Sequence, residues 1–267
     1  MIAKRVDFSQ NANTYDRRHG AVLSASMATR LAAHAQLRPG FKVLDVGAGT
    51  GRVAIALAAL GCEVVALDPA QAMLDVLQAK ARRVRLQRDR VPIHLIAAEG
   101  ARLPFADSTF DVAVLARILY LMPDWREVLS EVIRALNPNG QILHEWGNGT
   151  SDEEWVRIRE QARTLFEEAG IVNPFHPGAR AESEVDEFLA ARGFVVYEHV
   201  RENGDVYLTL SDFMARITRG ECSYTWDVPS EVQRLCLPQL EKWVAEHFAL
   251  DRALPIPREF SWTIYRR

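Results

Sequence analysis

The sequence predicts a doubly wound α/β fold, and three observations lead to this prediction. From Lys42 to Trp146, short aliphatic runs alternate with longer helical stretches, which is typical of βαβ units with a parallel sheet. A glycine-rich turn follows the first aliphatic run directly. Hydrophobic residues make up 48% and charged residues 25% of the 267 positions, a balance found in ordinary globular proteins.

The elements of this core are bounded by residues that stop helices. Strands are expected at 42–46, 63–67, 93–97, 111–116 and 140–146. Helices are expected between them, near 50–60, 70–83 and 124–136. Gly61 ends the first helix, and the turn of Asn137, Pro138, Asn139 and Gly140 leads into the fifth strand.

Beyond residue 147 the pattern changes to charged helices and isolated strands. Helices are expected near 152–169 and 182–192, and strands at 194–200 and 259–265. Between these strands the apolar spacing predicts an amphipathic helical stretch, with a break at Pro238. The predicted domains are an N-terminal helical cover at 1–39, a core at 40–210 and 255–267, and a helical insertion at 211–254 that covers the substrate pocket.

Composition and charge argue against several classes of protein. The formal charge of −3 supplies no field that would gather a polyanion. Three widely spaced cysteines without a CxxC pair, and an N-terminus without an apolar run, predict a cytoplasmic location. The most apolar region falls short of the ~20 residues that cross a bilayer. The seven histidines show no metal-ligand spacing, so no metal is expected.

The strongest local motif is a run of three glycines, Gly47, Gly49 and Gly51, with Ala48 between the first two. A strand that enters such a turn and continues as a helix lets bare backbone approach a ligand at the carboxyl edge of the sheet. Nicotinamide and flavin sites use GxGxxG, whose third glycine position is occupied here by Arg52, so the spacing is GxGxG instead. A turn that serves only strand-to-helix packing is the alternative interpretation.

With this motif the chain resembles the class I S-adenosylmethionine-dependent methyltransferases, in particular the ubiquinone- and menaquinone-biosynthesis-like subgroup, over residues 40–147. The resemblance implies a Rossmann-like, seven-stranded, mostly parallel sheet with one antiparallel strand. It also implies S-adenosylmethionine as the cofactor and S-adenosylhomocysteine as its product.

The resemblance assigns residues to the nucleoside half of the cofactor. Asp68, at the end of the second strand, corresponds to the acid that binds the ribose hydroxyls, and Pro69 follows it. Met73 matches a position that packs beside the adenine. Glu99 and Gly100 stand where the family contacts the adenine amino group and a ring nitrogen, with glutamate in place of the commoner aspartate. A helix cap for Asp68 and a surface role for Glu99 are the alternatives.

The same resemblance assigns the methionine half. Tyr15 lies in a short N-terminal element that covers the cofactor in this subgroup. Ala116 and Arg117 end the fourth strand and face the methionine, and Tyr120 stands where many relatives carry histidine. Each of these residues could instead serve only in packing.

The predicted function is methyl transfer to a small-molecule acceptor, with no catalytic base assigned. His144 and Trp146, at the end of the fifth strand, are candidates to face the substrate, and the insertion adds Phe213, Met214, Tyr224 and Trp226. A nucleic acid is not expected as partner, because the stretch after the fourth strand lacks the (D/N)PP(Y/F) motif of many nucleic-acid methyltransferases. An RNA methyltransferase and a non-catalytic cofactor-binding protein remain alternatives, and the oligomeric state is left open.

Overall fold

The chain, described as a computed structural model, folds into two compact units. The larger unit takes in 8–147, 178–201 and 260–267, and the smaller one 148–177 and 202–259 together with the N-terminal residues. The smaller unit thus includes 148–177, which the sequence had grouped with the core. The residues that the structure describes are 8–9, 12–19, 21–85, 93–146, 153–171, 177–202, 205–219, 222, 225, 228–257 and 260–267.

The larger unit is built on a seven-stranded sheet of order β3-β2-β1-β4-β5-β9-β6. Its strands are β1 (Lys42–Val46), β2 (Glu63–Asp68), β3 (Ile93–Ala97), β4 (Phe110–Ala116), β5 (Leu136–Glu145), β6 (Val195–Glu202) and β9 (Phe260–Arg266). Strands β1 to β5 pair in parallel, and β9 pairs antiparallel with β5. The predicted fold class, a mostly parallel seven-stranded sheet with one antiparallel strand, is confirmed.

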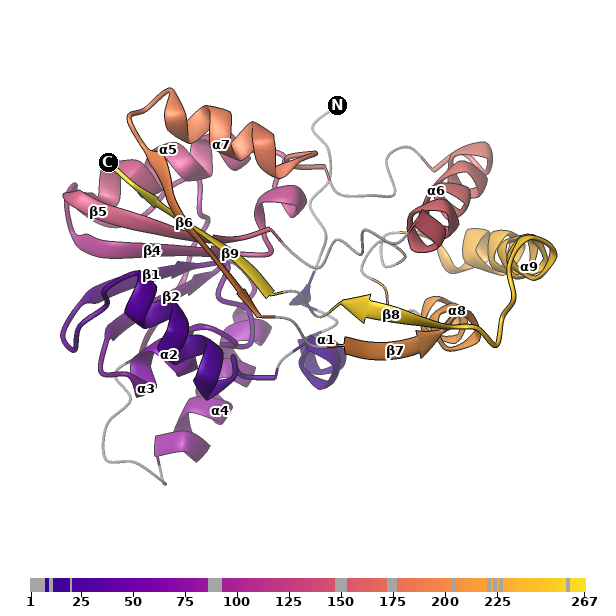
Figure 1. Ribbon diagram of the computed structural model, residues 1–267, viewed down its shortest axis with the longest axis horizontal. Coiled ribbons are helices and arrows are strands. Elements are labelled where there is room, and N and C mark those ends of the chain that lie inside the picture. The colour runs from indigo at the N-terminus through magenta and orange to yellow at the C-terminus, as the bar shows by residue number, and fades with distance from the viewer. Residues whose placement is uncertain are drawn as a thin grey trace. The chain divides into compact units, whose positions relative to one another are not determined.

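Helices cover both faces of this sheet, because its central strands are apolar on both sides (Figure 1). The helices α2 (Ala25–His34), α3 (Ala54–Ala59) and α4 (Gln71–Arg85) pack on one face. The helices α5 (Trp125–Ala135) and α7 (Glu182–Ala190) pack on the other. The turn before α3 extends to Val53, so this helix begins four residues later than the sequence suggested.

The N-terminal helix α1 (Ala12–His19) lies against α4. The ammonium of Lys80 donates to the Asp16 carboxylate at 2.7 Å, with both side chains largely covered. This contact holds the residue next to Asp16, Tyr15, at the carboxyl edge of the sheet.

The smaller unit has its own apolar core, shared by α6 (Glu153–Glu168), α8 (Leu210–Thr218) and α9 (Ser230–His247). The expected break at Pro238 is wrong, because α9 continues through this residue. Leu237 and Leu240 on either side are buried in that core, and their burial outweighs the one backbone hydrogen bond that a proline removes. A two-stranded antiparallel ladder of β7 (Asp205–Thr209) and β8 (Ala253–Pro257) completes the unit.

The described residues contain neither a candidate membrane span nor a candidate metal centre. None of the described helices combines the length and apolar character that crossing a membrane requires. Within the same residues, no three histidine, cysteine or acidic side chains gather as metal ligands would.

Candidate active site

The glycine loop between β1 and α3 has two glycines that serve packing and one that faces open space. A Cβ on Gly47 would lie 2.8 Å from Ile118 Cγ2, and one on Gly51 would lie 2.6 Å from Leu77 Cγ. Both have positive φ, 68° and 86°. Gly49, with φ of 53°, has no neighbour closer than 4.0 Å to such a Cβ. The bare backbone at Gly49 is therefore the part of the loop that a ligand can approach.

Asp68, at the end of β2, braces this loop. Its Oδ2 accepts a hydrogen bond from the Gly49 N–H at 2.9 Å, and its Oδ1 accepts one from the Ala70 N–H at 2.9 Å. Burial raises the pKa of the Asp68 carboxyl, the two backbone bonds oppose the rise, and nearby Glu99 adds to it. Asp68 thus caps the start of α4, as the alternative interpretation held, and at the same time binds the open glycine.

Tyr15 reaches the same point from α1. Its Cε1 is one of the two atoms nearest to the position that a Cβ on Gly49 would take, at 4.0 Å. Burial raises the pKa of the Tyr15 hydroxyl, while Arg117 and Arg52 lower it. The N-terminal element therefore brings an aromatic ring to the glycine loop.

A buried carboxylate, Glu145 at the end of β5, joins the glycine loop to the end of β4. Its side chain is 1% exposed. Oε1 accepts from Arg117 Nε at 3.0 Å and Nη2 at 2.8 Å, and Oε2 contacts Arg52 Nη2. The Arg117 N–H also donates to the Glu145 carbonyl at 2.7 Å. One carboxylate therefore orients two guanidinium groups at the carboxyl edge of the sheet.

Titratable groups around this cluster have shifted pKa values. Burial raises the pKa of Asp45 to about 7, against the attraction of Arg52. Burial lowers the pKa of Arg52 to about 9, and repulsion from Arg117 adds to the shift. Burial also raises the pKa of Tyr120 to about 12, so its hydroxyl is neutral near pH 7. Such clustering is typical of functional sites.

Two polar atoms beside the loop are buried with no hydrogen-bond partner among the described residues. They are Asp45 Oδ2 and Thr50 Oγ1. Buried polar atoms normally find partners, so these two atoms are open to a hydrogen bond from a polar ligand. A ligand with amino or hydroxyl groups would satisfy both.

The loop after β3 carries Glu99 and Gly100. Glu99 is exposed, and Gly100 is packed so that a Cβ would lie 3.1 Å from Val46 Cγ1 and 3.2 Å from Val128 Cγ1. Packing therefore favours glycine at position 100, because a larger side chain would crowd Val46 and Val128.

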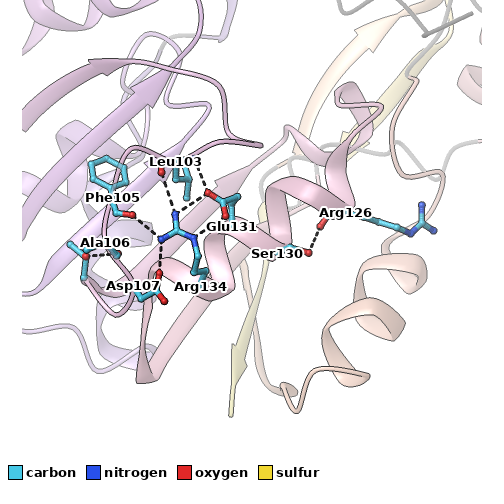
Figure 2. A network of polar contacts seen from close by, with 9 residues as sticks. Leu103, Phe105, Ala106, Asp107, Arg126, Ser130, Glu131 and Arg134 are labelled. Carbon is cyan, nitrogen blue, oxygen red and sulfur yellow. Dashed lines mark hydrogen bonds and ion pairs between the residues drawn. The ribbon is translucent and has the colours of Figure 1, made fainter.

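A polar network anchors this loop to α5 (Figure 2). The Arg134 guanidinium donates to the carbonyls of Leu103 and Phe105 and to the carboxylates of Glu131 and Asp107. Glu131 in turn accepts from the Leu103 N–H at 2.9 Å. Segment 103–107, which follows Glu99 and Gly100, is therefore fixed by charged contacts that the sequence did not suggest.

The last part of the site lies at the ends of β4 and β5 and just after them, where three aromatic rings gather. The rings of Tyr120 and Trp146 meet edge to face at 5.8 Å, and the ring of His144 lies 6.0 Å from that of Trp146. Gly178 packs against this turn so closely that a Cβ would lie 2.1 Å from the Leu119 carbonyl oxygen. Its N–H donates to the Tyr120 carbonyl at 2.9 Å, which fixes the turn.

The structure brings together most of the predicted site residues, and their role in binding stays a prediction. Around the glycine loop and the ends of β2 and β4 it places Tyr15, Gly47, Ala48, Gly49, Gly51, Asp68, Pro69, Ala116, Arg117 and Tyr120. Met73, on α4, is 2% exposed.

No role was expected from the sequence for Asp45, Arg52 or Glu145. A signal for Glu145 was present, since a charged residue inside the apolar run ILHEW is buried only when it is paired.

Comparisons with known proteins agree with this geometry. A family model described as a methyltransferase domain matches residues 44–144. A demethylmenaquinone methyltransferase from Clavibacter sepedonicus is 34% identical over 139 residues, which are 51% of this chain and 54% of the relative. The match thus spans about half the length of this curated relative.

Solved structures share the fold over nearly the whole chain. A candidate methyltransferase from Bacillus halodurans C-125 has a TM-score of 0.63 at 19% identity, covering 90% of this chain and 98% of that one. A [4+2]-cyclase, SpnF, has a TM-score of 0.60 at 16% identity, covering 97% and 93%. At these identities the likeness shows the fold alone. Residues 44–144 of this chain thus match a methyltransferase domain, and about half of the chain is similar to demethylmenaquinone methyltransferases.

Proposed function

We propose that this protein binds S-adenosylmethionine at the glycine loop and transfers the methyl group to a small-molecule acceptor, with S-adenosylhomocysteine as product. The observation that carries the proposal is the bond from the Gly49 N–H to Asp68 Oδ2, which fixes a carboxylate beside an open glycine backbone. The buried, unpartnered Asp45 Oδ2 and Thr50 Oγ1 at the same loop support it.

The residues of the site divide between the parts of the cofactor. Asp68 keeps a lone pair on each oxygen for the ribose hydroxyls. Glu99 and the Gly100 N–H stand at the adenine side, and Tyr15, Arg117 and Tyr120 at the methionine side. The sulfonium of the bound cofactor supplies an activated methyl group. The chain therefore has mainly to align the acceptor and exclude water.

The acceptor that we propose is small and partly apolar. The aromatic pair of Tyr120 and Trp146 at the ends of β4 and β5 supports this, as does the similarity to demethylmenaquinone methyltransferases. Not all of the insertion residues named from the sequence fall within the described part of the chain. Met214 is 6% exposed and lies in the core of its own unit, and Tyr224 and Trp226 lie outside the described residues.

Methyl transfer and cofactor binding test the proposal separately. Calorimetry is expected to show that the protein binds S-adenosylhomocysteine and does not bind NAD with comparable affinity. Release of S-adenosylhomocysteine is then measured with a demethylated naphthoquinol, phenols, carboxylic acids and amines as acceptors, and with bulk tRNA as a separate arm. Tight binding of NAD alone would contradict the cofactor assignment, and methylation of tRNA alone would contradict the acceptor class. Cofactor binding without release on any acceptor would favour a non-methylating protein of this fold, as the cyclase likeness allows.

Asp68→Ala is expected to weaken S-adenosylhomocysteine binding by about 10–100-fold, because two charge-assisted hydrogen bonds to ribose are lost and water replaces them in part. The loop brace at Gly49 is lost with them. The matched control is Asp75→Ala on the exposed face of α4, which is expected to leave the dissociation constant unchanged. If the dissociation constant were unchanged in both variants, Asp68 would serve only as a helix cap.

A further inference from the structure

His144 is a buried histidine that the cofactor assignment leaves without a role. It lies on β5, is 1% exposed, and has its Nδ1 3.7 Å from Glu182 Oε1 on α7. Neither ring nitrogen has a hydrogen-bond partner among the residues that the structure describes. A buried imidazole in this state is costly unless something binds to it.

A chain of polar groups connects His144 to the surface. Glu182 Oε1 accepts a hydrogen bond from the Thr263 hydroxyl at 2.9 Å. The same hydroxyl lies 3.1 Å from His199 Nδ1. Thr263 is fully buried and His199 is exposed. Thr263 therefore joins Glu182 to the exposed His199 by two short polar contacts, and the buried His144 faces the Glu182 end at 3.7 Å, slightly beyond hydrogen-bond distance.

The inner end of this path lies at the acceptor side of the site. The His144 ring is 6.0 Å from Trp146, whose ring meets that of Tyr120. The next residue of the strand, Glu145, holds Arg52 of the glycine loop and Arg117. The side chains of His144 and Glu145 point to opposite faces of the sheet, so they lie on either side of the end of β5.

We propose that His144 is the general base of the methyl transfer, oriented by Glu182, and that Thr263 and His199 carry its proton to solvent. This inference rests on the proposed function. It also narrows the acceptor to a molecule that must lose a proton from oxygen or nitrogen, such as a phenol or a hydroquinone.

The roles of the two His144 ring nitrogens follow from the position of Glu182. Glu182 facing Nδ1 selects the tautomer with a proton on Nδ1 and a lone pair on Nε2. For a phenol, the O–H bond breaks, a bond from Nε2 to hydrogen forms, and the electron pair stays on oxygen as the nucleophile. The proton of Nδ1 can then pass to Glu182. Rotation of the Thr263 hydroxyl passes a proton on to His199.

The groups packed around His144 are consistent with this role. His144, followed by Thr263, holds the pKa of Glu182 below its ordinary value, so this carboxylate is ionised near neutral pH. The Tyr265 ring lies 6.4 Å from His144, and its hydroxyl donates to Asp186 on α7 at 2.6 Å. Burial raises the pKa of that hydroxyl, so Tyr265 stays neutral. Glu182, Asp186, Tyr265 and His199 are the titratable groups that the contacts place along this path.

The first arm of the test needs no acceptor. Nitrogen-15 NMR of histidine-labelled protein with S-adenosylhomocysteine bound is expected to show His144 protonated on Nδ1 and bare on Nε2. Glu182→Gln is expected to shift this resonance pattern toward the other tautomer. A proton on Nε2 in the wild type would overturn the inference whatever the protein's activity.

The second arm measures kinetics on whichever acceptor the wild type methylates. His144→Gln is expected to lower kcat by about 10²–10⁴-fold and to remove the acidic limb of its pH profile, while the affinity for S-adenosylhomocysteine is unchanged. Thr263→Val keeps the side-chain volume and is expected to lower kcat without changing the tautomer. His94→Gln, on the exposed face of β3, is the control and should leave kcat unchanged.

The outcomes separate the inference from the proposed function. If the wild type is active and His144→Gln keeps its kcat and pH profile, the base assignment is wrong and methyl transfer stands. If the wild type methylates no acceptor, the proposed function fails and the base assignment fails with it. If His144→Gln does not fold, loss of kcat in folded Glu182→Gln and Thr263→Val supports the path, and full activity in both overturns it.

Discussion

Glu145→Gln is expected to lower the free energy of unfolding by about 3–5 kcal/mol, since removing one member of a buried ion cluster leaves the others uncompensated. The variant keeps the shape of the side chain, removes its charge and replaces one acceptor oxygen by an NH2 donor. Arg52 and Arg117 would then face each other without the carboxylate that both contact. Burial already lowers the pKa of Arg52, and repulsion from Arg117 adds to this shift.

Urea unfolding of the purified variant measures this loss. The matched control is Glu63→Gln on β2 of the same sheet, where the carboxylate is 46% exposed and lies 3.9 Å from His94. This exposed contact is expected to contribute no more than about 1 kcal/mol. If the two variants lost the same stability, the burial of Glu145 would not have the energetic weight assigned to it.

Gly178→Ala is expected to lower the free energy of unfolding by about 3–5 kcal/mol. A methyl group there would lie 2.1 Å from the Leu119 carbonyl oxygen and 2.7 Å from that of Met122, and backbone cannot move aside as a flexible side chain can. The segment must shift, and two hydrogen bonds are then lost. They run from the Gly178 N–H to Tyr120 and from the Ala179 N–H to Leu119.

Thermal and urea unfolding check this effect, with Gly193→Ala as the control. Gly193 has φ of 83° and no atom within 4 Å of the position that an added methyl group would take. Its replacement therefore reports backbone strain without crowding, about 1–2 kcal/mol. Only the Gly178 variant should also displace Tyr120 and lower methyl transfer. Equal losses in stability and intact transfer would show that the turn tolerates the methyl group.

Local pattern was sufficient to predict much of the larger unit. Strands at 42–46 and 93–97 were predicted to the residue, because turn residues bound each apolar run on both sides. The smaller unit was predicted less well. The β8 strand contains Pro255 and Pro257, which argue against a strand locally, and its pairing with β7 is a long-range contact.

The site shows the same division between local and long-range information. The glycine loop and Asp68 lie at the ends of two predicted strands, so the strand pattern was sufficient to place them at the carboxyl edge of the sheet. The roles of Glu145 and Gly178 depend on contacts with Arg52 and Leu119, respectively. These partners are distant in the sequence and come close only in the folded protein. No short window of sequence contains both members of either pair.

The position of β9 also has a consequence for how the chain reaches this structure during synthesis. Of the seven strands in the sheet, β9 is the last to leave the ribosome, yet it lies between β5 and β6. Until residues 260–267 emerge, β5 presents an open edge that can pair with another nascent chain. The same residues bring Thr263 to Glu182, so the polar path behind His144 does not exist before then. Completion of the sheet and completion of the site are therefore one event, and it follows the synthesis of every other strand.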